Sequence, residues 1–204
     1  MKKTVRCLCF VLLLLMTMAW GMAAATEALP AEVEALLRAA LPSHIISHAQ
    51  QCGNTAAAVV SDGQTQTLCV AEQNNGIWQL VVCNPNALRQ DTPVTSLYLD
   101  TDEVLFWSYH SYDAVYDTYN AYRSQSDHQW HVGGMMQSET HDNGNITEAH
   151  LSHNSGRLHY TTYFCDENEN VLSARQYTPV PAAWLEEQLL LTAYDDSRFP
   201  KPNQ

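Results

Sequence analysis

Short apolar runs separated by polar turn residues fill the middle of the chain, from residue 54 to residue 177. Side chains along a strand alternate between two faces, and runs of this length bounded by Asp-Gly, Asn-Gly or Asn-Pro are typical of antiparallel hairpins. The pattern predicts nine or ten strands, of which the clearest are 55–61, 65–72, 77–83, 94–99, 104–109, 129–138, 146–152, 157–164 and 171–177.

The segment 109–123 allows two interpretations. Its tyrosines recur at three- and four-residue spacing, which is typical of a helix, yet its content of Tyr and Val favours strands. We expect a strand, a turn near 113–117, and a second strand.

Helical spacing appears before this region. Apolar residues fall on one face between Pro30 and Pro42, which predicts a helix over 30–41. The apolar positions of 45–49 extend the same pattern, so the segment 26–53 is predicted to be helical.

Helical spacing returns near the end of the chain. Trp184, Leu185 and Leu189 share one side of a predicted helix over 181–194. The tail 195–204 should be loosely held.

These elements together predict a mainly β fold of the α+β kind. One β-rich domain over 54–194 would form an antiparallel meander, flanked by an N-terminal and a C-terminal helix. The pattern leaves open whether the meander is a curved sheet, a sandwich or a partial barrel.

The first residues read as a secretory signal peptide over 1–25. A cationic start at Lys2, Lys3 and Arg6 precedes an uncharged, mostly apolar run, and small residues at 23–25 close the segment. Cleavage is expected after Ala25 or Ala23, which would make the protein secreted or extracytoplasmic.

An uncleaved membrane anchor is the alternative for this segment, because 7–25 approaches the roughly 20 residues that span a bilayer. The small residues at its end favour cleavage.

Charge narrows the choice of partners. The full chain has a formal charge of −12, and loss of the three basic residues of the leader takes it to −15. Such an acidic protein repels phosphate backbones and anionic lipid heads, so we expect no nucleic-acid partner and no membrane partner after cleavage.

Four cysteines follow the leader, at Cys52, Cys69, Cys83 and Cys165. An even number in an exported chain permits disulfides in any of three connectivities, and the same residues could equally be free thiols packed as small apolar side chains. A two-residue turn at 75–76 would place Cys69 opposite Val82, so that a bond between Cys69 and Cys83 would require a β-bulge.

Six histidines lie within 32 residues, at His128, His131, His141, His150, His153 and His159. His128 and His131 point to opposite faces of a strand, as do His150 and His153, so their spacing does not build a zinc or copper site. The sequence predicts no metal and no cofactor.

Catalytic motifs give no lead. No G-x-S-x-G sequence surrounds a serine, and no glycine-rich phosphate loop is present; Gly133-Gly134 is better explained by a bulge or a close backbone contact. If the protein were an enzyme, its catalytic residues would be scattered over several hairpins. The sequence does not decide whether it is an enzyme, and it favours a protein without catalytic activity.

Aromatic residues suggest a binding surface instead, because aromatic faces bind apolar surfaces while their polar tips hydrogen-bond. The candidate residues are Trp107, Tyr109, Tyr112, Tyr116, Tyr119, Tyr122 and Trp130. The leading hypothesis is a non-enzymatic exported module that binds an extracellular protein or carbohydrate; the alternative is an extracellular hydrolase. A pocket that gathers His and carboxylate side chains would favour the hydrolase, and a flat aromatic face would favour binding.

Overall fold

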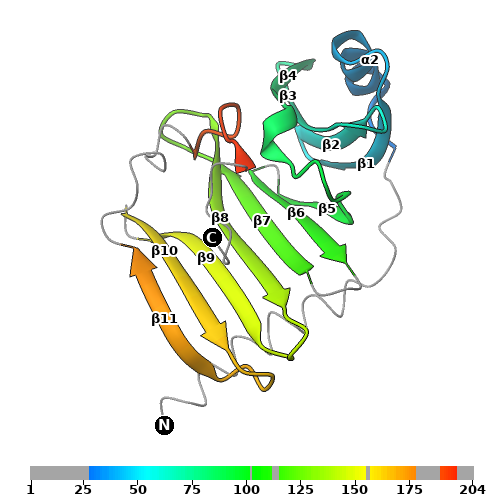
Figure 1. The fold of residues 1–204 in the computed structure, drawn as a ribbon. Helices are drawn as coiled ribbons and strands as arrows, with labels where there is room; N and C mark the ends of the chain where they lie inside the picture. Colours follow the sequence, from blue (N-terminus) through cyan, green and yellow to red (C-terminus); the bar gives the residue numbers. More distant parts are fainter. Residues whose placement is uncertain (1–27, 102, 112–114, 155–156, 178–188, 197–204) are drawn as a thin grey trace.

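The computed structural model describes residues 28–101, 103–111, 115–154, 157–177 and 189–196. Within these ranges the chain forms eleven strands in two antiparallel sheets, with the orders β1-β2-β3-β4 and β11-β10-β9-β8-β7-β6-β5. Neighbouring strands are consecutive in both sheets, which confirms the mainly β meander (Figure 1). The described strands form two open sheets and no closed barrel.

The smaller sheet follows a single α-helix of the described chain. Its elements are α2 (Ala31–Ala40), β1 (Ile45–Cys52), β2 (Thr55–Ser61), β3 (Gln66–Asn74) and β4 (Ile77–Asn84). A short 3-10 helix, η1 (Pro85–Ala87), then leads to the larger sheet. That sheet contains β5 (Ser96–Thr101), β6 (Val104–Ser111), β7 (Val115–Arg123), β8 (Trp130–Thr140), β9 (Ile146–Asn154), β10 (Arg157–Cys165) and β11 (Val171–Tyr177).

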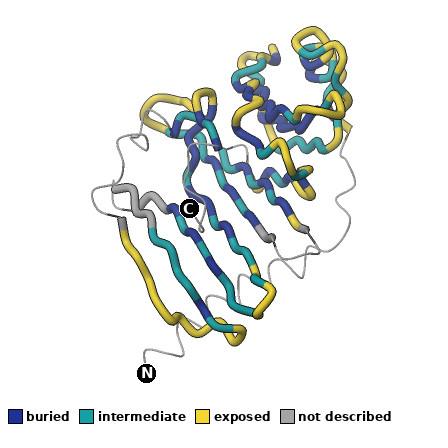
Figure 2. Tube along the Cα trace, in the orientation of Figure 1, coloured by how far each residue is buried: buried dark blue, intermediate teal, exposed yellow. Residues whose placement is uncertain are grey.

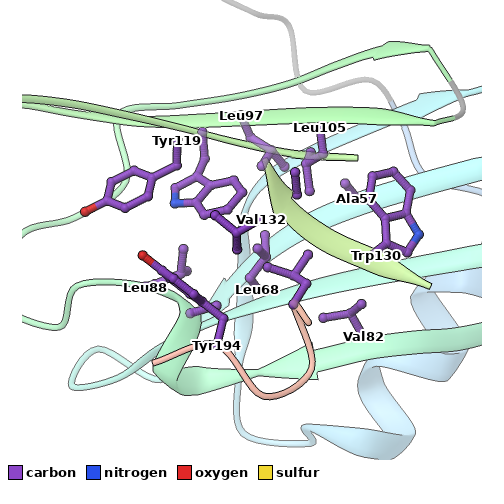
Figure 3. Packing of buried hydrophobic residues seen from close by; sticks show 14 of the residues in the cluster. Ala57, Leu68, Val82, Leu88, Leu97, Leu105, Tyr119, Trp130, Val132 and Tyr194 are labelled. Carbon is purple, nitrogen blue, oxygen red and sulfur yellow. The ribbon is translucent and has the colours of Figure 1, made fainter. Parts of the chain in front are cut away.

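The smaller sheet is the middle of three layers. Val33 and Leu37 of α2 pack on one of its faces, against a cluster that includes Trp78. Its other face packs against the larger sheet around Leu68 and Val70 of β3 (Figure 3). The residues of this inter-sheet core include Ala57, Val59, Val82, Leu97, Leu99, Leu105, Trp107, Tyr119, Val132 and Met135. Burial is greatest at this contact and falls toward β11, whose described side chains are exposed (Figure 2).

The first strand corrects the prediction of a helical segment over 26–53. Residues 45–52 form β1, which pairs with β2 from Ile45↔Ser61 to Cys52↔Thr55. The apolar spacing of this short segment fits a helix, but hydrogen bonding to a neighbouring strand outweighs so short a local preference. The segment 109–123 is strand on both sides of residues 112–114, which lie outside the described ranges. Asp117, expected near the turn, lies within β7.

The C-terminal segment bridges the two sheets. Asn84 of β4 donates hydrogen bonds from Nδ2 to the carbonyl oxygens of Leu191, at 2.7 Å, and Tyr194, at 2.8 Å. The backbone N–H of Leu191 donates to the Trp130 carbonyl at 2.7 Å, next to a β-bridge between His131 and Leu190.

The predicted helix over 181–194 is wrong for the part of it that the structure describes, 189–194. Leu190 forms a bridge to β8, and the backbone N–H groups of Ala193 and Tyr194 then donate to the Leu190 carbonyl at 2.8 Å, which closes a turn instead of a helix. Leu189 and Leu191, on either side of the bridge, are both buried. Asp196 is also buried, which corrects the expected loose tail at that residue. Residues 181–188 and 197–204 lie outside the described ranges.

The register shifts in five of the described strand pairs, and two of these shifts bear on the sequence predictions. Asn75 and Gly76 have positive φ angles, 53° and 79°, and Asn74 faces Ile77 as the two-residue turn predicts. A register shift between Val70 and Ala71 then places Cys69 opposite Cys83 rather than Val82.

The second bulge lies at Gly133-Gly134, as predicted for this pair. Asn120 of β7 faces Gly134 while Ala121 faces Val132, so Gly133 is the extra residue. A Cβ atom on Gly133 would lie 2.5 Å from Oδ1 of Asn120, which explains why glycine occupies the position.

One buried carboxylate joins the two sheets. Oε1 of Glu72, in β3, accepts hydrogen bonds from Nε of Arg123 at 2.7 Å and from Nε1 of Trp130 at 2.8 Å. Glu72 is 6% exposed. Its charge is tolerated there because it is paired and hydrogen-bonded.

We expect Glu72→Ala to lower the free energy of unfolding by about 3 kcal/mol, because it leaves the Arg123 charge and the Trp130 N–H without this acceptor. Glu34→Ala is the control, since Glu34 forms an exposed pair with Arg38 at 3.6 Å and should cost at most about 0.5 kcal/mol. Urea unfolding followed by circular dichroism measures both, and equal losses would contradict the role given to Glu72.

Candidate functional site

Four residues of the predicted aromatic surface lie in the core. Trp107, Tyr109, Tyr119 and Trp130 are each at most 3% exposed. The rings of Trp107 and Tyr119 stack at 5.3 Å between centroids, and the ring of Tyr109 meets that of Tyr119 edge-on at 5.7 Å. In this fold these four side chains stabilise the inter-sheet core and offer no surface to a ligand.

The remaining predicted residues are placed differently. Tyr122 is half-buried and stacks on His131, with 5.7 Å between the ring centroids. Tyr116 belongs to β7, and Tyr112 lies outside the described residues. The seven residues therefore do not share one exposed face.

A different set of aromatic side chains lies on the opposite face of the larger sheet, which we call the outer face. Tyr98 and Phe106 are cross-strand partners on β5 and β6 and are half-buried, with ring centroids 6.5 Å apart. Their sequence neighbours Leu97, Leu99 and Leu105 all point into the inter-sheet core. Alternation along the strands therefore turns Tyr98 and Phe106 away from the core.

A second aromatic group lies on the outer face at β9 and β10. The rings of His150 and Tyr163 meet edge-on at 5.1 Å, and Nε2 of His150 lies 3.0 Å from Oε2 of Glu148. All three side chains are half-buried. They offer ring edges, a hydroxyl and a carboxylate to solvent.

Residues of mixed character separate the two groups. Ser108, Thr118 and Ser138 occupy outer-face positions of β6, β7 and β8, and Met136 of β8 lies beside Thr118 on the same face. Oγ1 of Thr118 is buried. Strands lie about 4.8 Å apart, so five strand spacings place Tyr98 roughly 24 Å from Tyr163. The outer face thus has two aromatic ends and a middle of serine hydroxyls and the Met136 side chain, which suits an extended ligand.

The sequence holds a signal for this face that the prediction did not use. In β6, Leu105, Trp107 and Tyr109 occupy alternate positions, and Phe106, Ser108 and His110 occupy the others. The second set is the more polar one, so it belongs to the less buried face. Aromatic content alone does not separate the two sets.

The histidines with described contacts each have a partner close by. Nε2 of His131 lies 2.9 Å from Oδ2 of Asp127, and Nε2 of His141 lies 2.6 Å from Oγ1 of Thr147. The described part of the chain holds no group of three or more His, Cys, Asp or Glu side chains arranged to bind a metal. The side chains of His153 and His159 are not among those described.

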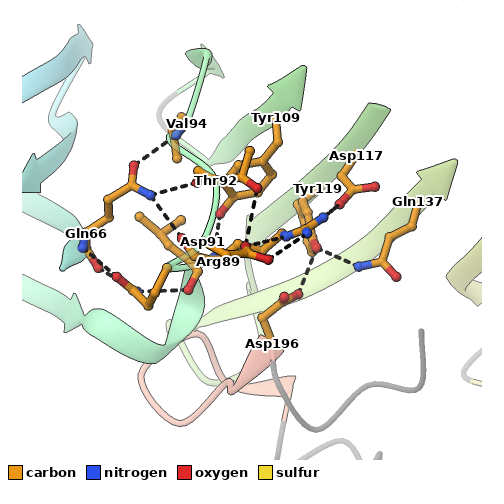
Figure 4. Close-up of polar contacts among 12 residues, drawn as sticks. Gln66, Arg89, Asp91, Thr92, Val94, Tyr109, Asp117, Tyr119, Gln137 and Asp196 are labelled. Atoms are coloured by element: carbon orange, nitrogen blue, oxygen red, sulfur yellow. Dashed lines mark hydrogen bonds and ion pairs between the residues drawn. The ribbon is translucent and has the colours of Figure 1, made fainter. Parts of the chain in front are cut away.

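A buried polar network lies beside the inter-sheet core (Figure 4). Arg89 binds Asp117 through Nη1 and Asp91 through Nε, at 3.1 Å from Oδ1. The backbone N–H of Arg89 donates to the hydroxyl of Tyr109 at 2.9 Å. Arg89 thereby fixes the connection between η1 and β5 to two strands of the larger sheet.

The same network holds the C-terminal segment. The hydroxyl of Tyr119 donates to Oδ1 of Asp196 at 2.8 Å and accepts a hydrogen bond from Nε2 of Gln137, also at 2.8 Å. Burial, and then the nearby Asp196 carboxylate, raise the pKa of Tyr119 and of Tyr194 well above the ordinary value of tyrosine. Both hydroxyls therefore stay protonated and serve as structural hydrogen-bonding groups.

One hollow gathers residue types that a hydrolase would use. It has a volume of about 320 Å³, and its lining includes Ser47, His48, Ser61 and Asp91. Nδ1 of His48 lies 3.3 Å from Oγ of Ser47, whose hydroxyl donates to the Val59 carbonyl at 3.1 Å. Both carboxylate oxygens of Asp91 bind Arg89, so Asp91 does not orient the imidazole of His48.

Comparison with known proteins finds no family model, no curated protein and no solved structure that matches the chain. No helix among the described residues combines the length and the apolar character needed to cross a bilayer.

The two carboxylates bound to Arg89 differ in burial, so they are expected to contribute differently to the free energy of unfolding. Asp117 is 2% exposed, and the side chain of Asp91 is 71% exposed. Asp117→Ala should lower the free energy of unfolding by about 3 kcal/mol, because it removes one partner of a buried ion pair. Asp91→Ala should cost at most about 1 kcal/mol because solvent screens an exposed pair. Urea denaturation measures both, and an equal cost would show that burial does not decide the strength of these pairs.

Proposed function

We propose that this protein is a non-enzymatic, exported binding module that holds an extended extracellular carbohydrate on the outer face of the larger sheet. The observation that carries the proposal is the arrangement of this face, with Tyr98 and Phe106 at one end and His150 and Tyr163 at the other. Aromatic rings pack against the apolar faces of sugar rings, and hydroxyl groups between them hydrogen-bond to sugar hydroxyls.

An extracellular protein is the alternative ligand. Its extended segment would meet the same half-buried aromatic and polar side chains. The preference for a carbohydrate comes from the middle of the face, where Ser108 and Ser138 provide uncharged hydroxyl groups and Met136 provides an apolar side chain. Sugar rings present hydroxyl groups and apolar faces that match both.

The rival function, an extracellular hydrolase, would use the hollow beside Ser47 and His48. Burial lowers the pKa of His48 below the ordinary value, which favours a neutral imidazole. Yet the neighbouring carboxylate of Asp91 is held by Arg89, and the serine hydroxyl is bound to a backbone carbonyl. These contacts support binding over hydrolysis as the function.

Export is part of the proposal and rests on the leader sequence. Residues 1–27 lie outside the described ranges, so the signal peptide over 1–25 stays a prediction from the sequence. The acidic composition after cleavage suits a soluble exported protein.

The binding proposal is tested by affinity electrophoresis in gels that contain β-glucan, xylan, soluble chitin oligomers or mucin. Phe106→Ala and Tyr163→Ala should each weaken retardation, with a roughly three- to tenfold loss of affinity. Ile77→Ala is the control, because Ile77 is 64% exposed but belongs to the smaller sheet.

Three outcomes would count against a carbohydrate on the outer face. Retardation by none of the four polysaccharides, or equal retardation of all variants, would reject it. Release of reducing sugars that His48→Ala abolishes would favour the hydrolase instead.

Cleavage of the leader is checked by intact-mass measurement of protein from the culture medium of a secreting host. We expect the secreted chain to begin at Thr26, or at Ala24 if the earlier site is used. Recovery of the full-length chain in the membrane fraction would instead indicate an uncleaved anchor.

A further inference from the structure

The bulge in the β3–β4 hairpin brings two cysteines together. Cys69 and Cys83 are direct cross-strand partners, although the turn at 75–76 alone would pair Cys69 with Val82. Directly opposed residues of an antiparallel pair have Cα atoms about 4.5–5.5 Å apart, which falls within the range that a disulfide spans.

Both thiols lie on the face of the smaller sheet that α2 covers. Cys69 belongs to the core cluster beneath α2, and Val82, next to Cys83, belongs to the inter-sheet core on the other face. Cys69 is 1% exposed, whereas Cys83 is exposed to solvent. Burial, and then the adjacent Cys83 thiol, raise the pKa of Cys69.

The other two cysteines of the described chain are not placed to form a disulfide with Cys69 or Cys83. Cys52 packs against the inter-sheet core, on the opposite face from Cys69, and its Sγ lies 4.0 Å from the Asp100 carbonyl oxygen in β5. Cys165 lies on β10, five strand spacings or roughly 24 Å from β5. Cys52 and Cys165 are therefore too far apart to bond to each other, and the fold selects one pair.

We propose that Cys69 and Cys83 are a redox site that closes to a cross-strand disulfide when the protein meets a disulfide oxidant such as oxidised glutathione. The four thiols are free in this structure, so the proposal concerns the oxidised form. It goes beyond the proposed function, because it needs neither a ligand nor a binding surface.

The exposure of the two sulfurs sets the order of the steps. Cys83 loses its proton to solvent, and its thiolate attacks one sulfur of oxidised glutathione, which releases one glutathione thiolate and leaves a mixed disulfide. Cys69 then loses its proton and attacks Sγ of Cys83, which releases the second glutathione. The protein dithiol is oxidised by two electrons, and one glutathione disulfide is reduced to two thiols.

The bond would tie the edge strand β4 to β3 across the turn. A closed loop of about 15 residues restricts the unfolded chain enough to lower the unfolding equilibrium constant roughly a hundredfold. Oxidation should therefore reduce local opening of β4 around Trp78 and Leu80, which pack in the cluster beneath α2.

The test uses the full chain, purified reduced and then incubated with a mixture of oxidised and reduced glutathione. Remaining thiols are blocked with N-ethylmaleimide, and the protein is digested with trypsin and a glutamate-specific protease, which cuts at Glu72 between the two cysteines. Mass spectrometry should find the peptide with Cys69 linked to the peptide with Cys83, and urea unfolding should show the roughly hundredfold stabilisation.

Variants separate this bond from the other possible ones. The peptide that ends at Glu72 contains both Cys52 and Cys69, so Cys52→Ser is needed to tell them apart, and this variant should keep the link. Cys83→Ala should remove both the link and the stabilisation. Cys83 is exposed, so Cys83→Ala should fold and match the reduced wild-type protein in stability. Full labelling of Cys83 after oxidation, or a link that survives Cys69→Ala, would overturn the proposal.

Discussion

Burial of one continuous apolar face between the two sheets is the constraint on which the rest of the structure depends. Leu68 and Val70 from the smaller sheet meet Leu105, Trp107 and Val132 from the larger one, and neither sheet could hide this surface alone. The polar groups around the contact follow from it. Glu72 accepts hydrogen bonds across the junction, and Asn84 holds the C-terminal segment against its rim, because buried polar atoms must find partners wherever the sheets exclude water.

Local patterns in the sequence explain most of the strands. The bounds of β2 match the predicted 55–61, and the Asn-Gly pair at 75–76 fixes the start of the β3–β4 ladder, because these features depend on alternation and turn chemistry. β1 and the segment 189–194 could not be predicted in this way. β1 is fixed by hydrogen bonds to β2, and the segment 189–194 is placed by its bridge to β8 before a local turn. An apolar spacing that fits a helix carries no information about those distant partners.

The candidate site shows the same division. Aromatic content pointed to β6 and β7, but the inter-sheet core takes Trp107, Tyr109 and Tyr119. Which face of a strand is buried depends on what packs against it, and that is decided by the whole fold. The outer face carries the side chains that alternation along each strand turns away from this core, including the aromatic groups at its two ends.

Uneven support of the larger sheet has a consequence for its dynamics. The smaller sheet packs on the β5 side, whereas the described side chains of β11 are exposed along their length. Amide hydrogen exchange should thus be slow where the sheets meet and faster toward β11, since few buried contacts among the described residues oppose local opening there. The inter-sheet packing therefore constrains the twist of the larger sheet most at β5 to β7 and least at β11.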